Sequence, residues 1–159
     1  MNEDTRNPNH ILGGRVIWII DDEFQKVLSR PELSHLRDDE MMEGTRPIDR
    51  GTLKGLLAVG DWDDANVRDL CEQCVGTAAD VVAFTQPSSA IHYLSSGVFA
   101  PDVIVFDLVY DSFPTDTKPL AQLDELLRRC ASLVQVYSGH ANDFNDDLST
   151  LQSKYSARL

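Results

Sequence analysis

The chain has 159 residues, of which 42% are hydrophobic and 25% are charged, as in an ordinary globular domain. Its formal net charge of -12 argues against direct binding to nucleic acid, which requires clustered lysine and arginine side chains. No apolar run is long enough to span a membrane and no signal peptide is recognisable, so we expect a cytoplasmic protein.

The first predicted strand ends in a group of carboxylates. Residues 1–14, which precede it, show no hydrophobic period, and we expect them to form a flexible arm. The apolar run Val16–Ile20 is typical of a strand buried on both faces in a parallel sheet. Asp21, Asp22 and Glu23 follow it directly, and their mutual repulsion is relieved either by solvent at a turn or by a bound cation.

Residues 24–60 give a mixed pattern. They contain short helical pieces interrupted by Pro31 and an acidic run over residues 38–43 of the kind usually found on solvated faces. A further helix is predicted between a cap at Asp49 and an end at Gly60.

The next predicted helix carries two of the three cysteines. It begins after Asp63 or Asp64 and ends before Gly76. Cys71 and Cys74 share one face of it, and no second cysteine pair or histidine pair at zinc spacing accompanies them. We therefore expect reduced thiols that pack in the core.

The rest of the chain alternates strands with helices. The predicted elements are a strand over residues 81–84, a helix from Pro87 to Gly97, a strand over 103–106 followed by Asp107, a helix over 120–127, a strand over 133–137 followed by Ser138, and a helix capped by Asp146 or Asp147. Such alternation specifies a parallel, doubly wound sheet with helices on both faces.

The residues that follow the strands predict a metal site. Asp21, Asp22, Asp107 and Ser138 all stand at strand ends, and the carboxyl ends of parallel strands share the edge of the sheet where ligands bind. Carboxylates from neighbouring strands suit Mg2+, which prefers oxygen ligands and keeps several waters. A carboxylate beside this cation can attack a phosphoryl group, and a hydroxyl such as that of Ser138 can then hydrogen-bond the phosphate.

Three segments carry a family resemblance. They are Ile19-Ile20-Asp21-Asp22-Glu23, the run from Ala90-Ile91 to Pro101-Asp102-Val103-Ile104-Val105-Phe106-Asp107-Leu108, and Val136-Tyr137-Ser138-Gly139-His140-Ala141. In this order, and with this spacing between Asp107 and Ser138, they resemble the receiver domain of bacterial two-component response regulators. The resemblance implies a flavodoxin-like, doubly wound α/β fold over residues 15–159.

The same resemblance implies a role for each site residue. Asp107 would accept the phosphate, and Asp21 and Asp22 would hold Mg2+ together with Asp107. Val109 would offer its backbone carbonyl to the metal, and Ser138 would contact the phosphate. The chain would then be a phosphoacceptor and not an enzyme. A sensor histidine kinase or a phosphotransfer protein would supply the phosphate, which would switch the interaction with a partner.

The chain departs from the family pattern after its first strand. Residues 24–60 form an insert where the family has only a few residues, and such an insert could cover the pocket or bind a partner. A rival alignment takes residues 56–61 as the first strand and Asp61, Asp63 and Asp64 as the acidic cluster, which suits the family spacing better. We prefer Val16–Ile20 because it is the better buried strand.

The C-terminal features of the family are also missing. No counterpart of the fifth strand, its lysine or the last helix follows, and Lys154 lies in a helical pattern and not at a strand end. Without that lysine the phosphate loses a charge partner, which leaves a second hypothesis, a degenerate pseudo-receiver that binds partners without phosphorylation. The missing strand would leave an open edge suited to a homodimer. A hydrolase of the haloacid dehalogenase type ranks last, because it requires a second Asp where this chain has Val109.

Overall fold

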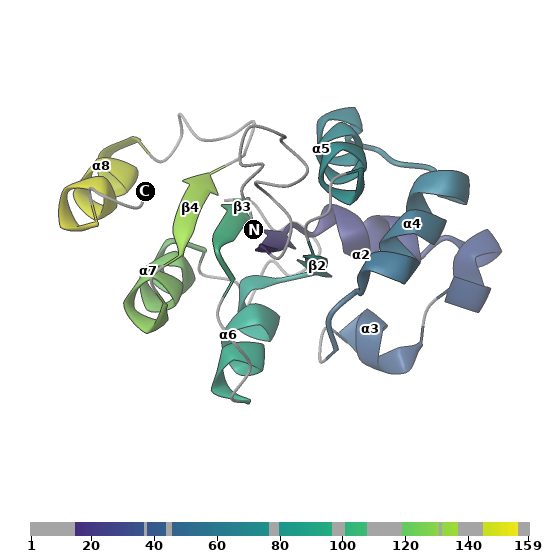
Figure 1. Ribbon diagram of the computed structural model, residues 1–159, viewed down its shortest axis with the longest axis horizontal. Helices are drawn as coiled ribbons and strands as arrows, with labels where there is room; N and C mark the ends of the chain where they lie inside the picture. Colours follow the sequence, from purple (N-terminus) through teal and green to yellow (C-terminus); the bar gives the residue numbers. More distant parts are fainter. Residues whose placement is uncertain are drawn as a thin grey trace, which may run out of the picture.

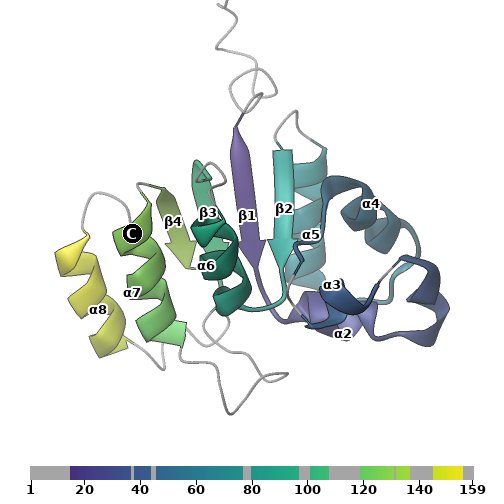
Figure 2. The same ribbon diagram turned by 90° about the horizontal axis from the view of Figure 1, so that it is seen from below.

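The computed structural model describes residues 15–36, 38–43, 46–76, 80–96, 101–107, 119–130, 132–136 and 145–155. Within them the chain forms a four-stranded sheet in the order β2-β1-β3-β4, with every pair of neighbours parallel (Figures 1 and 2). The strands are β1 (Val16–Ile20), β2 (Asp80–Phe84), β3 (Val103–Phe106) and β4 (Leu133–Val136). The α/β class and the parallel sheet predicted from the alternation of elements are confirmed.

The strand β1 lies inside the sheet. Its last residue, Ile20, pairs with Phe84 of β2 on one side and with Phe106 of β3 on the other. Trp18, Ile19 and Ile20 are almost completely buried. Because successive side chains of a strand point to opposite faces, this unbroken apolar run requires a hydrophobic cover on both sides.

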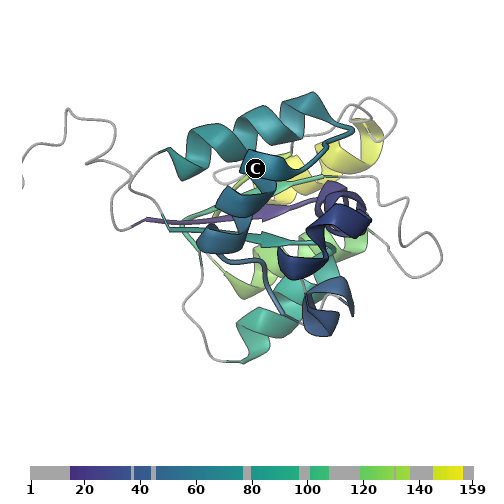
Figure 3. The ribbon, with the colours of Figure 1, turned by 90° about the vertical axis from the view of Figure 1, so that its right-hand side faces the viewer.

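Helices provide that cover on each face of the sheet (Figure 3). One face carries α4 (Arg50–Val59) and α5 (Ala65–Val75), and the other carries α6 (Pro87–Ser95) and α7 (Pro119–Arg129). Ile17 and Ile19 belong to the core on the α4 and α5 side. Trp18 and Ile20 belong to the core on the α6 and α7 side. The alternation along β1 thus divides the interior into two layers.

The segment 24–60 is part of this core. It contains α2 (Glu23–Leu28), the 3-10 helix η1 (Pro31–Leu36), α3 (Asp39–Glu43) and α4. Leu33, Leu53 and Leu56 are fully buried in the layer that covers Ile17 and Ile19. Ile48 also forms an antiparallel bridge with Ala83, with N–O distances of 2.8 and 2.9 Å, on the outer side of β2. The segment therefore contributes to the sheet and its cover.

The rival alignment, with its first strand over residues 56–61, is wrong, because Leu56 and Leu57 belong to α4. The Asp49 side chain accepts a hydrogen bond from Thr52 N at 2.7 Å and so caps this helix as predicted. Gly60 N donates to Leu56 O at 2.8 Å, where the helix ends. A short run of Leu, Ala and Val fits a helix or a strand equally well, and packing on the sheet decides between them.

The last helix, α8 (Asn145–Lys154), begins earlier than predicted. Asp146 and Asp147 lie inside its first turn, so the prediction that one of them precedes the helix as a cap is wrong. Acidic residues are favoured both at the cap and in the first turn, and the sequence pattern does not separate these positions.

The helix α8 lies next to α7 at the β4 end of the molecule (Figures 1 and 2). Tyr155 and Lys154 hydrogen-bond Asp124 of α7 at 2.7 and 3.2 Å. The strand β4 is the edge of the described sheet, and its Leu133 is 56% exposed. No helix within the described ranges has both the length and the apolar character needed to cross a membrane.

Candidate functional site

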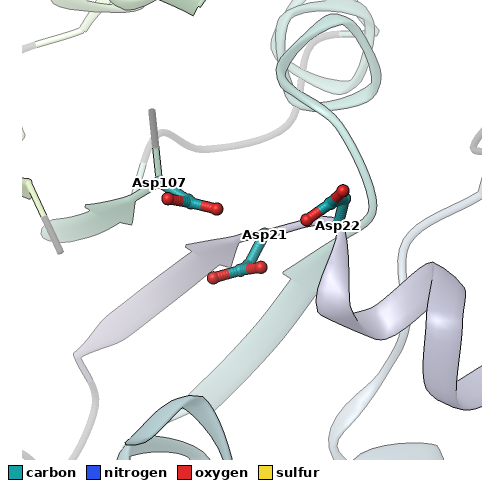
Figure 4. A group of neighbouring side chains, drawn as sticks. All are labelled: Asp21, Asp22 and Asp107. Atoms are coloured by element: carbon teal, nitrogen blue, oxygen red, sulfur yellow. The ribbon is translucent and has the colours of Figure 1, made fainter. Parts of the chain in front are cut away.

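Three aspartates meet at the carboxyl ends of β1 and β3. Asp21 and Asp22 follow β1 directly, and Asp107 follows β3. One carboxylate oxygen from each of the three lies within 4.8 Å of the others (Figure 4). The prediction that these residues come together is confirmed in the structure, because β1 and β3 are neighbours in the sheet.

The backbone hydrogen bonds of the sheet continue for one residue beyond the ends of β1 and β3. Asp107 N donates to Ile20 O at 3.1 Å, and Asp21 N donates to Phe84 O at the same distance. These bonds place Asp21 and Asp107 side by side at the end of the parallel ladder. Their positions are thus set by the most buried part of the fold.

Each carboxylate after β1 has its own local arrangement. One oxygen of Asp21 accepts a hydrogen bond from Glu23 N at 2.9 Å. Asp22 occupies the N-cap position of α2, but its side chain makes no capping hydrogen bond. Both aspartates are more than nine-tenths buried, and the Asp22 carboxylate is turned toward the group instead of the helix end.

The burial of Asp21 close to the other two aspartates raises its pKa. Burial, followed by the neighbouring charges of Asp107, Asp22 and Asp64, raises the pKa of Asp21 to about 8, although the hydrogen bond from Glu23 N lowers it. Converging carboxylates in a buried place disfavour their own ionisation. A divalent cation reverses this effect, because its charge favours the ionised form of every carboxylate around it.

Glu23 has a different role from its two neighbours. Its side chain accepts hydrogen bonds from Asp63 N at 2.6 Å and Asp64 N at 2.9 Å. Asp64 in turn caps α5 by accepting from Asn66 N and Val67 N. Glu23 therefore holds the loop before α5, and burial raises its pKa despite these two hydrogen bonds. The sequence pattern grouped Glu23 with the aspartates, and only the direction of its side chain separates them.

Three sets of residues from the sequence analysis remain. Val109 and Ser138 lie outside the described residues, so their assigned contacts stay predictions. Cys71 lies in the core with Val67 and Cys74 packs against this core, as expected; neither forms a disulfide with a described residue, and burial raises the pKa of each. Lys154 lies on α8 and pairs with Asp124, away from any strand end, as its helical pattern indicated.

The fold and site together define an α/β protein with a parallel sheet whose carboxyl edge carries a buried group of three aspartates. No protein-family model, no curated protein and no solved structure matches this chain.

Proposed function

We propose that the chain is a receiver-type signalling domain that accepts a phosphoryl group on Asp107 in the presence of Mg2+. The single observation that carries this proposal is the convergence of Asp21, Asp22 and Asp107 at the ends of two neighbouring strands.

The strand order supports the same proposal. The order β2-β1-β3-β4 agrees with the first four strands of a flavodoxin-like sheet, in which ligands bind where the order reverses, between β1 and β3. The three aspartates occupy this position. A flavodoxin-like fold is the architecture that we propose for the chain as a whole.

The three aspartates suit Mg2+ by the chemistry of their donor atoms, because this cation binds proteins through one or a few carboxylates and keeps several waters. When bound, it supplies positive charge next to the phosphoryl oxygens. The reaction itself is a displacement at phosphorus. An oxygen of the Asp107 carboxylate forms the new P–O bond, and the bond from phosphorus to the donor breaks with its electron pair leaving on the donor. Asp21 and Asp22 hold the site in the geometry set by β1 and α2.

A second candidate is a pseudo-receiver that binds partners without phosphorylation. The observation that favours it is the placement of Lys154, which pairs with Asp124 on α7 and so does not take the part of the family's lysine. In this case the acidic group binds a cation without accepting a phosphoryl group. The helices of residues 24–60 or the β4 edge then bind the partner, including a second copy of the chain.

The test is the intact mass of the protein after incubation with Mg2+ and acetyl phosphate. We expect the mass of one phosphate to be added to the parent and to be absent from Asp107→Asn. The matched control is Asp80→Asn, which changes an exposed aspartate at the opposite end of a neighbouring strand and should leave the adduct unchanged. If the parent binds Mg2+ but gains no phosphate, the pseudo-receiver is the correct function.

A further inference from the structure

Thr85 stands in the same row of the sheet as two of the three aspartates. It directly follows β2, as Asp21 follows β1 and Asp107 follows β3. Ile20 pairs with Phe84 and with Phe106, so the next row brings Thr85, Asp21 and Asp107 together, with Asp21 in the middle. The hydrogen bond from Asp21 N to Phe84 O, 3.1 Å long, confirms that the ladder between β1 and β2 extends to this row.

The alternation of side chains puts Thr85 on the same face as Asp21. Val81 and Ala83 of β2 lie in the core layer on the α4 and α5 side, together with Ile17 and Ile19 of β1. A further step of two residues along each strand leads to Thr85 and Asp21. The two side chains are therefore cross-strand neighbours on one face.

The Thr85 hydroxyl is a buried polar group. The residue is 2% exposed, and its hydroxyl oxygen has no partner among the described residues. It does not cap the following helix, since Gln86 holds the N-cap position of α6. A buried hydroxyl without a partner costs free energy, and such groups in native proteins usually serve a ligand, an ion or a water.

We propose that Thr85 is a positioning residue of the cation site. Its hydroxyl hydrogen-bonds a water bound to the divalent cation, and this water bridges the hydroxyl to the carboxylate of Asp21. Neighbouring strands lie about 4.8 Å apart, a spacing that one water bridges. Outer-shell hydroxyls of this kind orient the carboxylates that hold the metal. The inference rests on the proposed function, because it assigns Thr85 to the same cation site.

The experiment measures the Kd of Mn2+ and of Mg2+ for the full chain by calorimetry. Thr85→Val removes the hydroxyl and keeps the shape of the side chain, and we expect it to weaken the affinity about tenfold. Thr85→Ser keeps the hydroxyl, so its affinity for the cation should stay near the parent value. Ser89→Ala is the matched control, because Ser89 Oγ is also buried and has no partner in the described part of the chain, but lies inside α6. We expect this control to leave the Kd unchanged.

Thermal unfolding in EDTA separates this role from a structural one. Without the cation, the hydroxyl has no partner among the described residues. Thr85→Val should therefore unfold in EDTA at the parent temperature or above it, and lose only the extra stability that the cation gives. An equal loss of stability in EDTA and in Mg2+, or an unchanged Kd in a parent that binds the cation, overturns the role of Thr85 and leaves the proposed function intact. A parent that binds neither cation overturns the proposed function and this inference together.

Discussion

Replacing Asp21 by Asn should stabilise the protein at pH 8 when no divalent cation is present. Asn is close to Asp in shape, and its side-chain oxygen can still accept the hydrogen bond that Glu23 N gives to Asp21 at 2.9 Å. It carries no charge, so the repulsion from Asp107 and Asp22 and the cost of burying an ion disappear.

The size of the stability change follows from the raised pKa of Asp21. A group whose pKa is raised on folding contributes stability below its unfolded pKa and loses that contribution as the pH rises through its folded pKa. For Asp21 this stability is lost over the pH range from 3.8 to about 8. At about 1.4 kcal/mol per pKa unit, the full loss is roughly 6 kcal/mol, and roughly 4 kcal/mol of it falls between pH 5 and pH 8. This is an upper limit, because a small shift of Asp107 or the entry of water relieves part of the repulsion.

The assay is urea unfolding in EDTA at these two pH values for the parent and for Asp21→Asn. We expect the parent to lose a few kcal/mol between the lower and the higher pH, and the variant to lose much less. Asp80→Asn, at an exposed position on β2, serves as the control and should follow the parent. If the parent and Asp21→Asn show the same dependence on pH, the carboxylate of Asp21 is not the group that titrates, and the electrostatic argument is refuted.

Three other predictions concern the site and its supports. Mg2+ should raise the unfolding temperature of the parent more at pH 8 than at pH 5, because the cation competes with the proton held by Asp21. Asp107→Asn should reduce this rise in temperature. An equal rise at both pH values would contradict a carboxylate site. Glu23→Ala should lower the free energy of unfolding in urea by about 2 kcal/mol and accelerate hydrogen exchange at the Asp63 and Asp64 amides. Glu23→Gln keeps an acceptor and should lose less stability. Unchanged exchange in Glu23→Ala would show that Glu23 does not hold the loop. Leu56→Ala should lower the free energy of unfolding in urea by about 2–5 kcal/mol, because Leu56 is fully buried where α4 packs in the core. A loss typical of a surface position would mean that residues 24–60 do not belong to the core.

The sequence by itself determined the elements and the strand ends of this protein. The unbroken apolar runs of β1 and β3 indicated strands covered on both faces, and Asp21 and Asp107 were recognisable because they stand where these runs stop. Asp49 was recognisable as a cap from its position before a helical pattern. All of these features depend on neighbours within a few residues, so local periodicity and the chemistry of helix ends are sufficient to predict them.

Tertiary structure alone decided which strand ends meet and which way side chains turn there. The order β2-β1-β3-β4 makes β1 the neighbour of both β2 and β3, and so brings Asp107 and Thr85 to Asp21 from distant parts of the chain. It also turns Glu23 away toward the loop before α5 and makes Leu56 part of a buried helix. Strand pairing and packing join residues that are far apart in the sequence, and a period of two or of 3.6 residues contains no information about such contacts.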